Sequence, residues 1–375
     1  MPQQHAARSE LTQLIEAEER TYLELLESEL ARFFEAQERL LADISEESLP
    51  LLESIRSLST GGKRLRALLC YWGWRGAGGA VHAPEVVTAG AALELFQSSA
   101  LIHDDIIDNS DTRRGAPAVH KQFESMHRTQ SWRADAASFG VSAAIIVGDL
   151  CLSWSEQVFA SIGEKVALGT EARRIFDLMR TEVMSGQYLD VLGEVTDAGD
   201  SVALQRAQHV IRYKSAKYSC EHPLALGGAL ALGTQASHDH SLLHAYREFA
   251  LPLGEGFQLR DDLLGVFGSP QETGKPAGDD LKEGKRTVLI ALTHQLASAE
   301  QWQRIDEGLG DQGISPVDIA ELQQIITDSG AREQVEASIA EKENTVSQRL
   351  EQLPVDDTVR LALERIVGKA LHRTS

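Results

Sequence analysis

The chain has 375 residues, and its 56 acidic and 36 basic side chains give a formal net charge of −20. A protein this acidic is disfavoured as a general partner of nucleic acid or of an anionic membrane surface. The Glu-rich first 30 residues lack the apolar core of a signal peptide, and the longest apolar run, near residues 141–147, is too short to span a bilayer. We therefore expect a cytoplasmic protein without a transmembrane segment.

Residues 1–45 form a charged N-terminal extension whose apolar residues recur at helical spacing, and we expect it to be helical and partly disordered. Further stretches with helical periodicity follow, and Ser315 and Pro316 make a typical helix start. These predicted helices lie at about 47–58, 85–108, 139–161, 168–193, 200–232, 240–267, 288–297, 316–329, 332–351 and 356–372. No stretch shows strand alternation, a hairpin signal or a linker, so the sequence predicts one all-α domain over residues 46–375.

Three cysteines, Cys70, Cys151 and Cys220, are odd in number, widely spaced and without CxxC pairing. This pattern is typical of buried free thiols in a reducing compartment. The stretch 139–161 is apolar on almost every face, which predicts a central helix.

The segment STGGKRLR at residues 59–66 interrupts the helical pattern at its glycine pair, and a new helix starts with basic residues. Backbone N–H groups together with Lys63 and Arg66 would make an anion site there. The spacing is not that of a Walker P-loop. Taken alone, the segment is better explained as an ordinary turn with exposed Lys and Arg.

The segment LIHDDIIDNSDTRRG at residues 101–115 places carboxylates and guanidinium groups together. Asp104 and Asp108 are four residues apart and share a helix face, where they repel each other unless a cation lies between them. A few carboxylate ligands suit Mg²⁺, and Arg113 and Arg114 suit phosphate oxygens. A solvated acidic helix end is the alternative, but the preceding residues are almost uncharged and predict burial. The sequence therefore predicts a magnesium–diphosphate site.

Further polar motifs follow in the second half of the chain. Lys214 and Lys217 are three residues apart and share a helix face. Asp261 and Asp262 stand near the end of the predicted helix 240–267. The polar loop at 273–287 has four Lys or Arg and three acids, and a loop this long is usually functional or disordered.

Taken together, residues 50–370 resemble the trans-isoprenyl diphosphate synthases, also called polyprenyl synthetases. Five segments in the family's order carry the resemblance: GGKRLR (61–66), FQSSALIHDDIIDNSDTRRG (96–115), KSAKYS (214–219), GEGFQLRDDLLG (254–265) and TGKPAGDDLKEGKRT (273–287). The resemblance implies an all-α fold, a single large helical bundle of the isoprenoid synthase type with a central active-site cavity. Three residues depart from the family pattern: Gly265 replaces the third Asp of the second motif, Ser215 a Thr and Ala67 a Pro.

The resemblance also implies a reaction, in which an allylic diphosphate (dimethylallyl, geranyl or farnesyl) condenses with isopentenyl diphosphate. The metal ligands would be Asp104 and Asp108 for two Mg²⁺ ions and Asp261 for a third, with Mn²⁺ as a substitute. The allylic diphosphate would be neutralised by Arg114, Lys214 and Lys275, with Lys285 also binding substrate. Ser215 and Gln258 would face the allylic cation. Isopentenyl diphosphate would be held by Gly62, Lys63, Arg66, Gln97 and Arg113.

The helix that precedes Asp104 predicts the product length, since the growing tail must run along it away from the metals. Ser99 and Ala100 lie about one turn below Asp104, where farnesyl diphosphate synthases tend to have aromatic rings, and Phe96 lies about two turns below. We therefore expect geranylgeranyl diphosphate as the main product, with farnesyl or longer diphosphates as the alternative. The family is dimeric, so we also expect a homodimer.

Three rival functions remain on sequence grounds. A class I terpene cyclase needs a second motif of the type (N/D)DxxSxxxE, which DDLLGVFGS at residues 261–269 lacks. An HD-type phosphohydrolase could use His103 and Asp104, but it needs more His ligands, and His82 stands alone in a turn. A non-catalytic subunit of a heteromeric synthase is disfavoured by the intact metal and Lys/Arg motifs.

Overall fold

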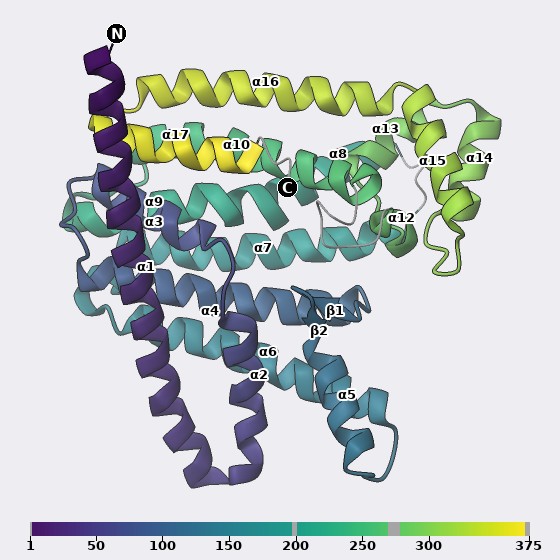
Figure 1. The fold of residues 1–375 in the computed structure, drawn as a ribbon, viewed down its shortest axis with the longest axis horizontal. Helices are drawn as coiled ribbons and strands as arrows, with labels where there is room; N and C mark the ends of the chain where they lie inside the picture. Colours follow the sequence, from purple (N-terminus) through teal and green to yellow (C-terminus); the bar gives the residue numbers. More distant parts are fainter. Residues whose placement is uncertain (1, 197–200, 269–277, 372–375) are drawn as a thin grey trace. The chain divides into compact units, whose positions relative to one another are not determined.

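A computed structural model describes residues 2–196, 201–268 and 278–371 of the chain (Figure 1). Nearly all of the described chain is helical, which confirms the all-α class. By their internal contacts the residues divide into two compact units whose sequences interleave. Unit 1 comprises Met1–Arg174, Pro223–His238 and Asp356–Ala362, and unit 2 comprises Ile175–His222, Asp239–Val355 and Leu363–Ser375. The single domain expected for residues 46–375 stays a prediction.

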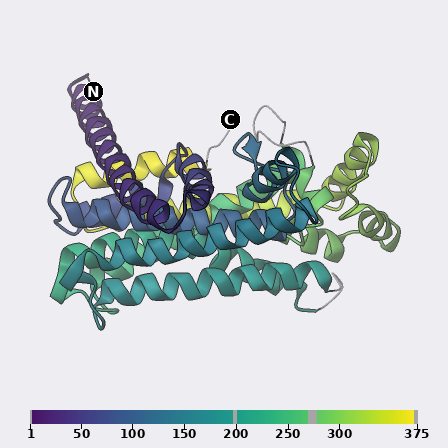
Figure 2. The same cartoon turned by 90° about the horizontal axis from the view of Figure 1, so that it is seen from below.

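Unit 1 holds most of the N-terminal helices. Its elements are α1 (Pro2–Ile44), η1 (Glu46–Ser48), α2 (Leu49–Ser59), α3 (Leu65–Gly76), α4 (Pro84–Ile107), β1 (Thr112–Arg113), β2 (Ala116–Pro117), α5 (Val119–Thr129), α6 (Ala136–Ala160) and η2 (Gly163–Val166). Most of α9 (His222–Leu232), η4 (Gly233–Gln235) and the start of α17 (Asp357–Leu371) also belong to it. Helices α4 and α6 run alongside each other, as both views show (Figures 1 and 2).

Helix α1 is held to the rest of unit 1 by polar as well as apolar contacts. The Tyr22 hydroxyl donates to the Ala67 carbonyl at 3.1 Å. Gly90 on α4 leaves room for this hydroxyl, since a Cβ on Gly90 would lie 2.3 Å from the Tyr22 hydroxyl oxygen. Trp72 Nε1 donates to Glu19 at 3.0 Å. The N-terminal extension contains one helix, which begins at Pro2 and continues to Ile44, and partial disorder within residues 1–45 stays a prediction.

Helices α3 and α9 approach each other closely because each presents a glycine to the other's backbone. A Cβ on Gly73 would lie 2.0 Å from the Leu224 carbonyl oxygen, and one on Gly227 would lie 1.8 Å from that of Cys70. No other residue type fits these contacts without moving a backbone. Cys70 and the other two cysteines are buried free thiols, as predicted, and burial raises the pKa of Cys70 to about 12.

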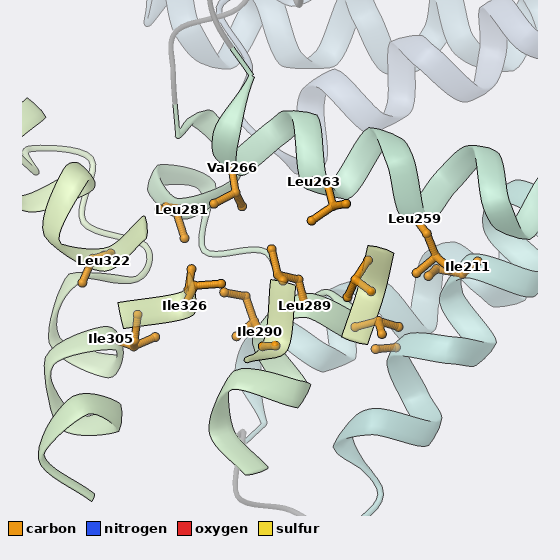
Figure 3. Packing of buried hydrophobic residues seen from close by; sticks show 14 of the residues in the cluster. Ile211, Leu259, Leu263, Val266, Leu281, Leu289, Ile290, Ile305, Leu322 and Ile326 are labelled. Atoms are coloured by element: carbon orange, nitrogen blue, oxygen red, sulfur yellow. The ribbon is translucent and has the colours of Figure 1, made fainter. Parts of the chain in front are cut away.

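Unit 2 contains the later helices. Its elements are most of α7 (Glu171–Val195), α8 (Ala203–Val210), the π-helix η3 (Ile211–Glu221), α10 (Ser241–Phe267), α12 (Asp279–Glu283), α13 (Val288–Leu296), α14 (Ala299–Gly308), α15 (Pro316–Asp328), α16 (Ala331–Gln352) and the end of α17. Its core forms where α10, α13 and α15 meet (Figure 3). Leu263, Leu289 and Ile326 are among the buried side chains there.

Two local expectations were wrong. A short antiparallel pair, β1 and β2, follows the first acidic motif, although no hairpin signal was found. The predicted helix 200–232 is two α-helices separated by a π-helix, whose wider turns are rare and frequent at functional sites. Helix α6 is partly exposed in the single chain, where Ile145 and Ile146 are 44% and 53% exposed.

Helix α6 meets the length and apolarity criteria for a membrane span. In the described part of the chain it is the one helix that does so, and core helices of water-soluble proteins pass the same test. Helix α6 packs against α4 and α5.

Candidate active site

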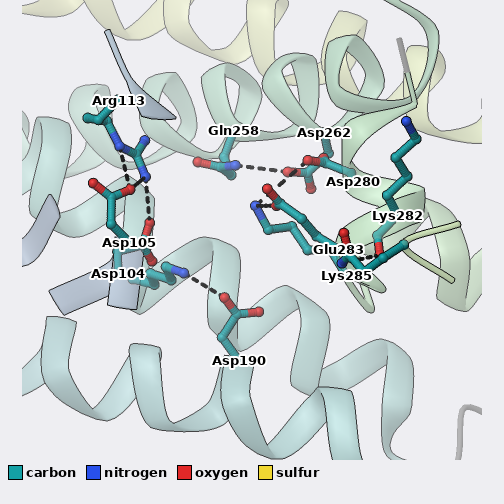
Figure 4. A network of polar contacts seen from close by, with 12 residues as sticks. Asp104, Asp105, Arg113, Asp190, Gln258, Asp262, Asp280, Lys282, Glu283 and Lys285 are labelled. Atoms are coloured by element: carbon teal, nitrogen blue, oxygen red, sulfur yellow. Dashed lines mark hydrogen bonds and ion pairs between the residues drawn. The ribbon is translucent and has the colours of Figure 1, made fainter. Parts of the chain in front are cut away.

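The first acidic motif lies at the C-terminal end of α4. Asp108 caps this helix, and its N–H donates to the Asp104 carbonyl at 2.8 Å, so the two residues lie one turn apart. Asp105, only 1% exposed, accepts a hydrogen bond from Arg113 Nε at 2.8 Å, and Arg113 Nη2 lies 3.4 Å from Asp104 (Figure 4). Burial alone would lower the pKa of Arg113, but the carboxylates of Asp105, Asp104 and Asp108 raise it. The guanidinium therefore stays charged and neutralises the motif.

A two-residue turn carries the next arginine. Thr112 pairs with Pro117 and Arg113 with Ala116, which leaves Arg114 and Gly115 as the turn, at φ of +55° and +77°. Two positive φ values are those of a type I′ hairpin, whose twist matches the flanking strands. Arg114 Nη1 donates to the Leu58 carbonyl at 2.9 Å. The hairpin thus aims Arg114 at the end of α2.

The loop after α2 adjoins this turn. Gly62 has φ of +90°, and a Cβ there would lie 3.1 Å from Arg114 Nη2, so a larger residue would be strained and would crowd the guanidinium. Lys63 is exposed, and Arg66 is half-buried in the first turn of α3. Burial lowers the pKa of Arg114, and Arg64, Arg113 and Arg66 lower it further. This concentration of guanidinium groups in a strongly acidic protein is an arrangement that binds anions.

The buried member of the GGKRLR segment is Arg64, which was not predicted as a site residue. Its Nη1 donates to Glu94 at 2.6 Å and its Nη2 to the Ser59 carbonyl at 2.6 Å. Both side chains are less than one tenth exposed. The sequence did indicate that Glu94 has a cationic partner, because Glu94 is the one charge in an apolar stretch and a buried charge needs a partner.

The second acidic motif lies near the end of α10. Asp262 is buried and accepts a hydrogen bond from Gln258 Nε2 at 2.8 Å (Figure 4). Burial raises the pKa of Asp262 to about 8, the charges of Asp280 and Asp261 raise it further, and Gln258 and Lys285 oppose the rise. Asp261, the predicted metal ligand, is half-buried.

The position that lacks the third Asp of this motif is filled by another carboxylate. A Cβ on Gly265 would lie 2.0 Å from Oδ2 and 2.3 Å from Cγ of Asp280. Asp280 belongs to α12, and its Oδ1 lies 3.7 Å from Lys285 Nζ. Gly265 therefore makes room for Asp280, whose carboxylate lies where a side chain at 265 would begin. No spacing in the sequence indicated that Asp280 takes the place of a side chain at position 265.

Lys214 and Ser215 lie on the π-helix η3, between two close helix contacts. A Cβ on Gly186 of α7 would lie 2.4 Å from the Lys214 nitrogen, and one on Gly254 of α10 would lie 2.6 Å from the Ala216 carbonyl oxygen. Lys214 Nζ lies 2.6 Å from Asp190 Oδ2. The two glycines and Asp190 therefore fix the position of Lys214.

The remaining predicted residues are placed as follows. Lys285 Nζ is 2.6 Å from Glu283 Oε2. Lys275 lies outside the described residues. On α4, Phe96 and Ser99 are buried, and Gln97 and Ala100 are half-buried. Arg113, predicted to hold isopentenyl diphosphate, bonds to Asp105, so its substrate role stays a prediction.

The donor set suits magnesium bridged by a substrate. Asp104 and Asp108 offer carboxylate oxygens one turn apart, with the Asp104 side chain 20% exposed. Across residues 2–196, 201–268 and 278–371, no group of three or more His, Cys, Asp or Glu is placed to hold a metal ion by itself. Mg²⁺ usually keeps several waters and binds through one or two carboxylates plus phosphate oxygens, so open carboxylates fit this ion.

The rival phosphohydrolase gains no support from the two histidines. His103 Nε2 is 3.4 Å from the Ile145 carbonyl oxygen and 3.6 Å from Asp149 Oδ1. His82 Nε2 is 3.1 Å from the Glu18 carbonyl oxygen. Each ring thus contacts a different helix.

Comparison with known proteins identifies the family. The polyprenyl synthetase family model matches residues 50–326. A crystal structure of geranylgeranyl pyrophosphate synthase from Corynebacterium glutamicum, complexed with isoprenyl diphosphate and magnesium, is 39% identical, has a TM-score of 0.86, and the match covers 94% of this chain and 98% of that one. Geranylgeranyl pyrophosphate synthase 11, chloroplastic, of Arabidopsis thaliana is 33% identical over 272 residues, which are 69% of this chain and 68% of the relative.

A relative with another product name is nearly as similar. The farnesyl diphosphate synthase of Geobacillus stearothermophilus is 32% identical over 256 residues, 65% of this chain and 75% of the relative. The comparisons therefore confirm the predicted resemblance and the short-chain prenyltransferase function. The chain belongs to the polyprenyl synthetase family.

Proposed function

We propose that this prenyltransferase is a magnesium-dependent geranylgeranyl diphosphate synthase that extends allylic diphosphates with isopentenyl diphosphate. The observation that carries the proposal is that each acidic motif has cationic side chains beside it. Arg113 and Arg114 follow the first motif, and Lys285 lies near the second. Carboxylates that hold metal ions and cations that bind oxyanions are the groups that diphosphate chemistry requires.

Each acidic motif has a proposed metal role. Asp104 and Asp108 would hold two Mg²⁺ ions, and Asp261 would hold a third, with Asp280 in place of the missing third Asp. When bound, Mg²⁺ supplies Lewis-acid stabilisation of the charge on the departing diphosphate.

The chain's own residues would bind and orient the two substrates. Lys214, fixed by Asp190, and Arg114 neutralise oxygens of the allylic diphosphate. The C1–O bond of this substrate breaks, and the bond from C4 of isopentenyl diphosphate to C1 forms. The proton lost from C2 of isopentenyl diphosphate passes to the released diphosphate. Ser215 and Gln258 face the positive charge, and Gly62, Lys63, Arg66 and Gln97 hold isopentenyl diphosphate.

A radiolabelled prenyl-transfer assay tests the metal proposal. We expect no product without Mg²⁺ or Mn²⁺, and a fall in kcat of at least about 10³-fold for Asp104→Ala and for Asp261→Ala, since each removes charge stabilisation in the transition state. Asp262→Ala is the matched control and should lose less, because Asp262 is buried. Near-normal turnover of either ligand variant would exclude the assignment.

Product analysis by chain length tests the proposed product. Ser99 and Ala100 lie about one turn before Asp104 on α4, and neither has an aromatic ring that would stop a fifteen-carbon chain. Phe96, about two turns away, would form the floor. We expect geranylgeranyl diphosphate from the wild type and a shift to farnesyl diphosphate in Ser99→Phe or Ala100→Phe. Unchanged products from both variants would mean that the tail does not follow this helix face.

We also propose a cytoplasmic homodimer. The exposed Ile145 and Ile146 give α6 an apolar outer face, which a second copy of the chain would cover in an isologous contact. Light scattering at the assay concentration should give twice the 41.0 kDa chain mass. A fully active monomer would contradict the proposal.

A further inference from the structure

The loop between α2 and α3, which would hold isopentenyl diphosphate, has an unusual backbone. Gly61, Gly62 and Arg64 all lie in the left-handed region, at φ of +76°, +90° and +49°. Glycine adopts this conformation at no steric cost, whereas an arginine stays in it only where the surrounding structure holds it there. The side-chain contacts of Arg64 therefore have to compensate for a strained backbone.

The guanidinium of Arg64 is a two-point bridge between this loop and α4. Its Nη1 donates to Glu94 Oε2 on α4 at 2.6 Å, and its Nη2 donates to the Ser59 carbonyl at 2.6 Å. The side chains of Arg64 and Glu94 are 7% and 8% exposed. Breaking the pair would leave a buried charge without a countercharge, so the bridge stays formed.

Further contacts hold the end of α2, where the loop begins. Ser59 Oγ lies 3.1 Å from Ser98 Oγ, and Ser98 is one turn beyond Glu94 on α4. The carbonyl before that of Ser59, which belongs to Leu58, accepts a hydrogen bond from Arg114 Nη1 at 2.9 Å. Two successive carbonyls at the C-terminus of α2 thus bind guanidinium groups, which the negative end of a helix dipole favours. The start of the loop is therefore fixed to α4, the helix that ends in the first acidic motif.

We propose that Arg64 and Glu94 are positioning residues that hold the isopentenyl diphosphate loop at a fixed distance from the first acidic motif. Glu94 and Asp104 lie on the same helix, so a loop anchored to Glu94 keeps a constant relation to Asp104. Both members of the ion pair are buried, so they would act through the loop and not on the substrate itself. The inference rests on the proposed binding of isopentenyl diphosphate by this loop.

Arg64→Lys separates the bridge from the charge. A lysine keeps a positive charge beside Glu94 but lacks the planar fork of donors that reaches two acceptors at once. Calorimetric titration of the full chain with isopentenyl diphosphate alone measures its Kd, since no condensation occurs without an allylic partner. We expect this Kd, and the KM for the same substrate in the prenyl-transfer assay, to rise roughly tenfold. The KM for farnesyl diphosphate should change by less than about twofold, because the metals rather than this loop would hold that substrate.

A double variant tests whether the pair only stabilises the fold. Arg64→Met/Glu94→Leu replaces the buried ion pair by apolar side chains, a change that often leaves stability unaltered. We expect an unfolding temperature near that of the wild type, whereas the Kd for isopentenyl diphosphate should stay raised roughly tenfold because nothing bridges to the Ser59 carbonyl. Recovery of both stability and affinity would mean that the pair is structural only, which overturns the proposal.

Arg75→Lys is the matched control. Arg75 lies in the last turn of α3 and also bridges a carboxylate and a carbonyl, since its Nε donates to Glu18 at 2.7 Å and its Nη1 to the Gly79 carbonyl at 2.8 Å. This variant should keep the Kd for isopentenyl diphosphate within about twofold of the wild type. Equal losses of affinity in Arg75→Lys and Arg64→Lys would show that any weakened contact of α3 has this effect, and the proposal would fail.

Lys63→Gln and Arg66→Gln distinguish this inference from the proposed binding role of the loop. A raised Kd in these two variants with an unchanged Kd in Arg64→Lys would overturn the positioning role alone and leave the loop as the binding site. An unchanged Kd in both variants would remove isopentenyl diphosphate from the loop, and the positioning role would then fall together with the residue assignment.

Discussion

The two acidic motifs contain the same Asp–Asp pair, yet the second Asp of each pair is stabilised in a different way. Asp105 and Asp262 are both buried, at 1% and 7% exposed. Asp105 accepts hydrogen bonds from the guanidinium of Arg113, eight residues further along the chain. Asp262 accepts one from the neutral amide of Gln258. One buried carboxyl therefore has a hydrogen-bonded countercharge, whereas the other is hydrogen-bonded to a neutral amide and feels Lys285 only through its charge.

The difference shows that a motif does not determine the protonation of its own residues. Burial raises the pKa of Asp262 to about 8, so its carboxyl is mostly protonated at neutral pH before any metal binds. Near Asp105, the raised pKa of Arg113 marks an ion pair. The hairpin of β1 and β2 returns Arg113 to α4 and so supplies the countercharge of Asp105.

The largest expected effect is the pH dependence of stability that Asp262 creates. Between about pH 4 and pH 8 the folded protein keeps a proton on Asp262 that the unfolded chain releases, so the free energy of unfolding falls as pH rises through this window. The free energy of unfolding falls by on the order of 5 kcal/mol across this window and changes little above pH 8 from this group. Asp262→Asn should lack it. Urea unfolding with EDTA at pH 5, 7 and 9 measures the difference, and parallel curves for the two proteins would contradict it.

The next effect comes from removing the countercharge of Asp105. Arg113→Met leaves a buried carboxylate unpaired, which should lower the free energy of unfolding by about 3–5 kcal/mol at pH 7.5 and by less at pH 5, where Asp105 can take up a proton. The double variant Asp105→Asn/Arg113→Met is the control and should recover much of the loss. Equal losses in the single and double variants would show that packing, not charge, is responsible.

A smaller effect should follow from crowding Asp280. Gly265→Ala places a methyl group where the Asp280 carboxylate lies, and overpacking of this kind costs about 1–3 kcal/mol. In an Asp280→Gly background the same change should cost less than half as much. Chemical unfolding of the four proteins in a double-mutant cycle gives the coupling. Additive costs would mean that the two residues do not share this space.

The smallest effect should come from the amide beside Asp262. Gln258→Leu removes a neutral hydrogen bond, which contributes about 1 kcal/mol to the free energy of unfolding. Thermal unfolding at pH 6 should therefore show a far smaller loss than Arg113→Met shows at pH 7.5. A loss as large as that of Arg113→Met would remove the distinction between countercharge and dipole.

The sequence predicted features with a local signature. Helical periodicity identified the all-α class, and the chain break at Gly61 and Gly62 falls between α2 and α3 as expected. Asp104, Asp108 and Arg113 were recognised together because they lie within ten residues of one another. Glu94 could have been paired with a buried cation, since it is isolated in an apolar stretch, but nothing in its spacing pointed to Arg64.

Features that depend on distant contacts were missed. Gly265 was interpreted as a loss from the motif, whereas the structure places the Asp280 carboxylate there, fifteen residues further along the chain. The π-helix around Lys214 was missed because its residues have ordinary helix propensities, and close contacts with Gly186 and Gly254 accompany it. Both features depend on packing between elements, and the periodicity of residues along one element cannot predict such packing.

The division into two compact units has a spectroscopic consequence. Of the five tryptophans, Trp72, Trp74, Trp132 and Trp154 belong to unit 1, and Trp302 belongs to unit 2. Intrinsic fluorescence of a Trp302→Phe protein would thus report on unit 1 alone, and its difference from the wild type would report on unit 2. One pair of proteins and one fluorimeter could then reveal whether the two units melt together or in succession.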